Sequence, residues 1–217
     1  MFRPVDDGGW NMFPRQKDET FHSPYAATLA LLVLLEIRAA DEPWEGSSER
    51  RDSIIRSTAR WLIERFDGGA SPAGWHRTVD TSDPVSPGLT LQAYGTLLRA
   101  EAEMSVEAPA AVHEAMTRRL IALSDSTMAD AVDSGEFGIV SMSLDGRMEM
   151  HSESINFLWH PWAVDAAARW LERSRCAPCE AEDVERVRRA LGHLVVVLGP
   201  EAVRPALSGW VFVASES

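Results

Sequence analysis

The chain has 217 residues, of which 45% are hydrophobic, and it carries a formal charge of −12 with a pI near 4.9. This length is typical of one domain, spanning residues 1–217, with a substantial core. The excess of negative charge would repel a phosphate backbone or an anionic bilayer over most of the surface, so nucleic-acid and membrane partners are disfavoured. The start does not resemble a signal peptide, no apolar run is long enough to span a bilayer, and only two cysteines occur, which favours a cytoplasmic protein.

A short pattern recurs along the chain and predicts its fold. Three Gly-Trp pairs mark loops, at Gly9-Trp10, Gly74-Trp75 and Gly209-Trp210. Residues 135–138 (Gly-Glu-Phe-Gly) stand where a further loop would fall. The first two pairs are each followed by a polar loop that ends in Ser-Pro, at Ser23-Pro24 and Ser86-Pro87. Serine as the N-cap and proline as the first helical residue predict that helices begin there.

The segments after these starts predict two kinds of helix. Residues 25–36 and 88–99 are apolar almost all round, as expected of inner helices that are enclosed on every side, and Pro161 begins a third inner helix over 161–173. Amphipathic stretches over 48–66, 110–123 and 182–198 predict outer helices. We therefore expect an all-α array of six helices in three hairpins, each hairpin burying its apolar face against the next.

The end of the first outer helix carries a family resemblance. Residues 60–66 (RWLIERF), followed by glycines and Gly74-Trp75, resemble the repeat of terpenoid cyclases and protein prenyltransferases, although Phe66 stands in place of that family's glutamine. The resemblance implies an α/α toroid, in which inner helices line a central cavity, but it does not imply the chemistry. Three hairpins are fewer than a closed ring needs. Either the shell is open and its edges are covered by a partner or a second copy, or further helices lie within residues 126–154.

An inserted β-hairpin is expected over residues 139–151, where apolar and polar residues alternate around Asp145-Gly146. A three-residue connection would place four apolar side chains on one face. It pairs Leu144 with Met148 and Met142 with Met150. Such a hairpin is either a flap packed on its own domain or a lid or partner-binding element.

If the inner helices all point the same way, the loops before them gather on one rim. That rim would hold histidines, carboxylates and two tryptophans of a cavity wall, a combination suited either to acid–base work or only to solvated loops. The candidate residues are His22, His76, Asp80, Asp83, His151, Glu153, Trp159, His160 and Trp162.

The sequence contains no complete catalytic motif. Cys176 and Cys179 lack two further zinc ligands, and neither a Gly-rich phosphate loop nor a nucleophile elbow occurs, so we expect no metal and no cofactor. The leading hypothesis is a non-catalytic helical-repeat interaction or regulatory module within a larger assembly, with a protein partner or self-association. The alternative is a toroid-type enzyme, either cyclase- or prenyltransferase-like or glycan-processing, that uses rim carboxylates and histidines and accepts, for instance, a small apolar ligand.

Overall fold

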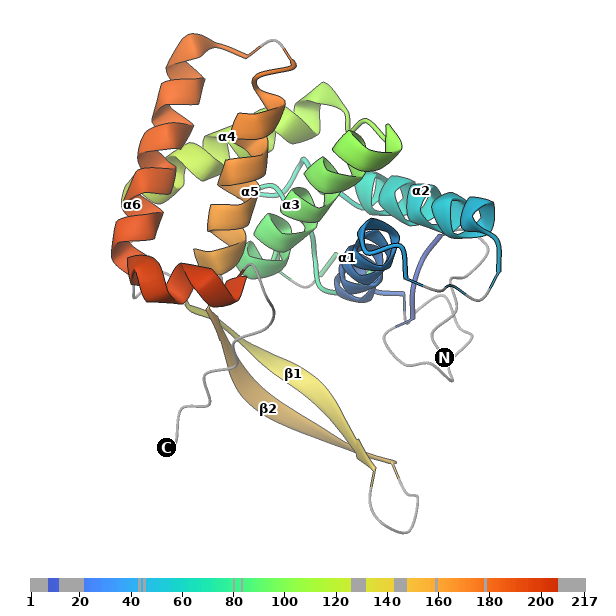
Figure 1. Cartoon of the computed structure of the whole chain (residues 1–217). Coiled ribbons are helices and arrows are strands. Elements are labelled where there is room, and N and C mark those ends of the chain that lie inside the picture. Colours follow the sequence, from blue (N-terminus) through green and yellow to red (C-terminus); the bar gives the residue numbers. More distant parts are fainter. Residues whose placement is uncertain are drawn as a thin grey trace.

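The computed structural model describes residues 8–11, 22–42, 44, 46–79, 81–82, 84–125, 132–142, 148–158, 160–177 and 179–206, and it describes only the backbone of the strands and of residues 125, 160 and 197–206. Six α-helices make up most of this part of the chain (Figure 1), so the predicted helical class is confirmed. They are α1 (Pro24–Ala39), α2 (Ser48–Glu64), α3 (Pro87–Met104), α4 (Ala110–Ala122), α5 (His160–Arg173) and α6 (Ala181–Ala206). The short 3-10 helix η2 (Leu123–Asp125) continues α4.

The three predicted inner helices begin at their prolines. Pro24 and Pro87 are the first residues of α1 and α3, and Pro161 is the second residue of α5. Before each of the first two prolines, the serine side chain accepts a hydrogen bond of 3.3 Å from the N–H group three residues later. The predicted helix starts are therefore confirmed, because proline lacks the N–H group that a first turn leaves unpaired.

Helices α1, α3 and α5 meet near their carboxyl-terminal ends. α3 packs against both α1 and α5. Ion pairs join the carboxyl-terminal halves of these neighbouring helices. These pairs are Arg99 with Glu36, Arg38 with Glu103 and Arg173 with Glu101.

The other three helices cover this row. α2 packs against α1 and α3, and α6 packs against α5 and α4. α4 is joined to α5 by the indole N–H of Trp170, which donates to Thr117 Oγ1 at 2.9 Å. As a result α3 lies in the middle, and residues 88–100 are all buried.

Only α3 is enclosed as the sequence predicts for an inner helix. Val33 on α1 is 56% exposed, and α5 presents a polar side as well as its buried Ala163, Ala166 and Ala167. The expectation that every inner helix is covered on all sides is wrong for α1, because α1 ends the row and has an inner neighbour on one side only.

Two of the Gly-Trp loops have the same backbone construction. The carbonyl oxygen of Trp10 accepts a hydrogen bond from the N–H of Ser23, and that of Trp75 accepts one from the N–H of Ser86, both at 3.0 Å. Each loop thus closes from its tryptophan to the N-cap serine of the next inner helix. The third pair, at residues 209–210, lies outside the described residues.

Both tryptophans fasten their loops to α2. The indole N–H of Trp10 donates to Thr58 Oγ1 at 2.8 Å, and that of Trp75 donates to the carbonyl oxygen of Leu62 at 2.7 Å. Both rings are buried, with exposures of 6% and 0%. Two loops whose tryptophans are 65 positions apart in the sequence therefore bind the same helix, α2.

Two strands follow η2 and form an antiparallel ribbon (Figure 1), β1 (Val132–Met142) with β2 (Met148–Leu158). They are longer than the expected range of 139–151, and residues 135–138, expected as a loop, lie within β1. The predicted register is wrong: Met142 is opposite Met148, and Met150 is opposite Val140. Leu144 lies outside the described residues. Five residues separate the paired Met142 and Met148, whereas the expected connection had three. The difference shifts the pairing by two positions, so the described residues that were expected to share one face of the ribbon still share it.

The close packing at Gly74 explains the glycine of the second Gly-Trp pair. A Cβ atom there would lie 2.7 Å from Val85 Cγ1 and 2.8 Å from Thr90 Cγ2. Thr90 Oγ1 also accepts the N–H of Trp75 at 3.0 Å, so this hydroxyl satisfies a buried backbone donor.

We predict that Thr90→Val lowers the free energy of unfolding by about 1–3 kcal/mol, because the Trp75 N–H is left buried without an acceptor. Thr96→Val is the matched control. Its hydroxyl donates only to the Gln92 carbonyl of its own helix, so its loss should cost less. Chemical denaturation of both variants measures the difference, and equal losses would contradict this role for Thr90.

A second close approach joins α3 to α5 at Gly95. A Cβ atom at this position would lie 2.6 Å from Asp165 Oδ2 and 3.5 Å from the Ala166 backbone. We predict that Gly95→Val destabilises the protein by about 1–3 kcal/mol through overpacking. Gly192→Ala on α6, where a Cβ would meet nothing within 4 Å, should instead raise stability by roughly 1 kcal/mol. Thermal unfolding of the two variants tests the contrast, which fails if Gly95→Val is neutral.

Candidate functional site

Two of the predicted rim histidines lie in adjacent loops. The side chain of Ser23, next to His22, donates a hydrogen bond of 2.5 Å to the carbonyl oxygen of Arg77, next to His76. His22 is 2% exposed and packs edge-on against Trp61, with ring centroids 6.1 Å apart. The structure therefore brings these two loops together, as expected for two loops of one rim.

His76 holds its own loop. It is 6% exposed, and its Nε2 lies 3.0 Å from Asp67 Oδ2. The hydrogen bond to His76, followed by those from the backbone of Gly69 and Ala70, holds the pKa of Asp67 below its usual value. Both of these histidine rings are buried within the described part of the chain.

The remaining rim candidates are not brought into one described cluster. Trp162 is half-buried against the core. His151 and Glu153 lie in β2 opposite Ile139 and Phe137, and His160 begins α5. Asp80, Asp83 and Trp159 lie outside the described residues.

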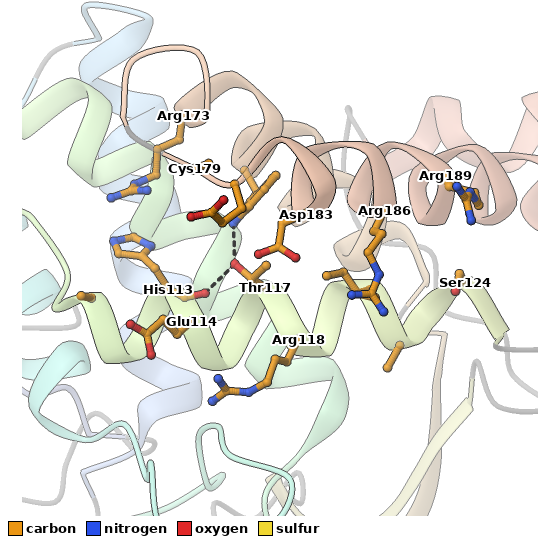
Figure 2. Close-up of a pocket in the computed structure, with 15 residues that line it drawn as sticks. His113, Glu114, Thr117, Arg118, Ser124, Arg173, Cys179, Asp183, Arg186 and Arg189 are labelled. Atoms are coloured by element: carbon orange, nitrogen blue, oxygen red, sulfur yellow. Dashed lines mark hydrogen bonds between the residues drawn. The ribbon is translucent and has the colours of Figure 1, made fainter.

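A hollow in the described part of the chain lies elsewhere, between α4, the end of α5 and α6 (Figure 2). It is an open groove of about 940 Å³. Its apolar part comes from Ala110, Ile121, Ala122 and Trp170. Its charged side chains are Glu114, Arg118, Arg173, Glu180, Asp183, Arg186 and Arg189. The groove is therefore lined by charged side chains of both signs and by a few apolar side chains.

The charges change sign along the groove. Glu114 precedes Arg118 by one turn of α4, and Asp183 precedes Arg186 by about one turn of α6. Figure 2 shows these residues in the same order along both helices, with Arg189 and Ser124 at the far end. The beginning of the groove thus holds Glu114 and Asp183, where Arg173 is paired with Glu101, and its far end is basic.

A buried polar cluster forms the wall at the beginning of the groove. The hydroxyl of Tyr94 lies 3.0 Å from His113 Nδ1, and His113 Nε2 lies 3.5 Å from Glu101 Oε2. Arg173 Nε donates to the other oxygen of Glu101 at 3.0 Å. This cluster joins α3, α4 and α5 at one point.

The surroundings of His113 in this cluster favour its neutral form. Burial lowers the pKa of His113, and the positive charge of Arg173 lowers it further, against the opposing effects of Glu101 and a backbone hydrogen bond at Ala108. Burial raises the pKa of Tyr94, so its phenol stays protonated at neutral pH. We therefore assign a phenol that donates to Nδ1 and a ring proton on Nε2 that faces Glu101.

This arrangement suits packing better than catalysis. Both ring nitrogens of His113 face protein groups, and Glu101 is held by Arg173. Among the described residues, no three His, Cys, Asp or Glu side chains are grouped to hold a metal ion. Cys179, which lines the groove, and Cys176 are free thiols.

Sequence reasoning missed this cluster, although one signal was present. The buried face of α4 consists of Val112, His113, Met116, Thr117 and Leu120. Polar residues at helical spacing on an apolar face need buried partners. The sequence does not say which residues on other helices provide them.

Comparisons with known proteins do not identify relatives. No protein-family model, no curated protein and no solved structure matches the chain. In the described part, no helix is both long and apolar enough to cross a membrane. The function must therefore be argued from the geometry.

We predict that the free energy of unfolding falls as the pH drops below about 6.5. The pKa of His113 is lower in the folded state than the unfolded value of 6.5, so the unfolded chain binds more protons in the interval between the two. The stabilisation is complete above the unfolded value and is lost as pH falls through the folded one.

Urea denaturation from pH 7.5 to 5 measures this dependence, and His113→Gln should flatten it. Gln can still accept from Tyr94 but does not titrate. His193→Gln, on α6 and not part of the cluster, is the control and should keep the dependence of the native protein. An unchanged slope in His113→Gln would show that other groups cause it.

Proposed function

We propose that this chain is a non-catalytic helical-repeat module that binds a protein partner in the groove between α4 and α6. The observation that carries the proposal is the groove itself, which is open to solvent and lined by exposed charged side chains on two neighbouring helices. Interfaces of regulated partners combine such a polar rim with a small apolar centre. Ile121 and Ala122 provide that centre.

The chemistry of the groove favours binding over turnover. A cyclase-like enzyme needs an enclosed, aromatic cavity and a carboxylic acid free to give up a proton. Here the hollow is open and about 940 Å³ in volume, and the partly buried carboxyl of Glu101 beside it is paired with Arg173. A peptide or a helix of a partner fits a groove of this kind.

We further propose that the six helices form an arc of an α/α toroid related to the terpenoid cyclase and prenyltransferase repeat. The packing of α3 against both α1 and α5, the ion pairs between their carboxyl-terminal halves and the two matching Trp-to-Ser loop closures support this arrangement. An arc leaves the row open at both ends, which fits a part of a larger assembly or a self-associating chain.

The hairpin is the second element that we assign to partner contact. β1 and β2 extend away from the helices (Figure 1), and β1 follows η2 in the element order, after the α4 side of the groove. Met142, Leu144, Met148 and Met150 supply soft apolar side chains suited to adaptable contact.

The proposal predicts site-specific contact with one protein. A photo-crosslinking amino acid at Ala122, exposed in the groove, should give one discrete product in the cells that make this chain. The same amino acid at Ser53, exposed on α2, is the control and should not give that product. Mass spectrometry identifies the captured chain, and a product of two copies would identify the partner as the protein itself.

Arg118→Glu combined with Arg186→Glu should abolish the Ala122 product, because it reverses the charge of the groove without touching buried residues. Identical products from Ala122 and Ser53, or no product from either, would contradict a binding role for the groove.

A further inference from the structure

Three arginines line the groove. Arg118 projects from α4 at about the level of Asp183, and Arg186 and Arg189 follow along α6 toward the far end (Figure 2). All three are exposed. Arg118 and Arg186 are 68 positions apart in the sequence. The fold, and not the local sequence, therefore places them along the same groove.

The positive charges of these arginines are hardly neutralised by carboxylates of the described part of the chain. Within the residues that the structure describes, neither Arg118 nor Arg189 forms an ion pair, and Arg186 reaches Glu182 only at 3.8 Å between side chains that are 50% and 82% exposed. By contrast, Arg188 on the same helix pairs with Glu185 at 2.6 Å. Exposed like charges along one groove with so little pairing favour an anionic ligand.

The anionic groups must belong to a ligand whose charge changes along its length. Moving back along the groove, a ligand that lies on Arg186 and Arg189 next meets Asp183 and then Glu114. A continuous polyanion, such as a nucleic-acid backbone or an anionic bilayer, would be repelled there, and the chain as a whole carries a charge of −12. A polypeptide can place carboxylates on the arginines and neutral or basic residues beside the carboxylates.

We propose that Arg118, Arg186 and Arg189 bind an acidic segment of a partner protein, in which Asp or Glu side chains adjoin a basic stretch. Guanidinium groups bind carboxylates through paired, charge-assisted hydrogen bonds, which gives such a site geometric selectivity. This inference rests on the proposed binding role of the groove and names the chemistry of the segment that enters it.

The test uses the full chain and a fluorescent peptide probe in anisotropy titrations. The probe has four glutamates, two alanines and four lysines, and the comparison peptides are all-lysine and all-glutamate peptides of the same length. The mixed probe should bind most tightly, and its affinity should fall as salt is added, because exposed charges are screened. Tighter binding of the all-lysine peptide would overturn the assignment.

Variants locate the binding. Arg118→Gln with Arg189→Gln should weaken binding of the mixed probe about tenfold, since each exposed ion pair contributes roughly a three- to fivefold change. Arg188→Gln, which removes a paired arginine outside the groove, should change affinity less than about twofold. Equal losses in the two proteins would overturn the site. Thermal unfolding checks that both variants stay folded.

Two further measurements separate the competing explanations. Inorganic phosphate that displaces the probe at concentrations similar to those of the all-glutamate peptide would identify a simple anion site and overturn the peptide assignment. If the probe does not bind but crosslinking from Ala122 persists, the groove is an interface and only the acidic-segment inference fails. If both fail, the proposed function itself is wrong.

Discussion

The burial of α3 on every side is the constraint on which the rest of the structure depends. Residues 88–100 leave no position for solvent, so each neighbouring helix must present a surface that fits α3. Gly95 lets α5 approach closely, Thr90 satisfies the second tryptophan loop, and Arg99 reaches the carboxyl-terminal end of α1. A helix enclosed in this way fixes the positions of all the elements around it.

The polar groups on this buried helix act as connectors. Arg99 contacts Glu36, Glu103 and the Leu35 carbonyl oxygen, and thereby joins α3 to α1. Tyr94 joins α3 to α4 through His113. A buried polar group is costly without a partner, so these connections also specify which helix packs where. The groove between α4 and α6 is a product of this arrangement, because α4 is held to the inner row by its buried histidine and threonine.

The sequence predicted those features that depend on neighbouring residues. Ser-Pro pairs specify helix starts because the capping hydrogen bond spans only three residues, and Pro24, Pro87 and Pro161 are placed as expected. The groove and its cluster depend on contacts between distant residues, such as Glu101 with Arg173, and no local pattern specifies them. The prediction of the ribbon's register was wrong for a related reason. The alternation of apolar residues determines which residues share a face, but it does not determine the length of the turn.

The positive charges of this protein are chemically uniform. Lys17 is the single lysine of the sequence, so every cation in the groove and in the helix-joining ion pairs, apart from a protonated histidine, is a guanidinium group. A guanidinium keeps its proton throughout the range in which proteins fold, and it is not a substrate for lysine acetylation. Neither alkaline conditions nor acetyl transfer can therefore erase the basic end of the groove, and its attraction for anions is a permanent property of the fold.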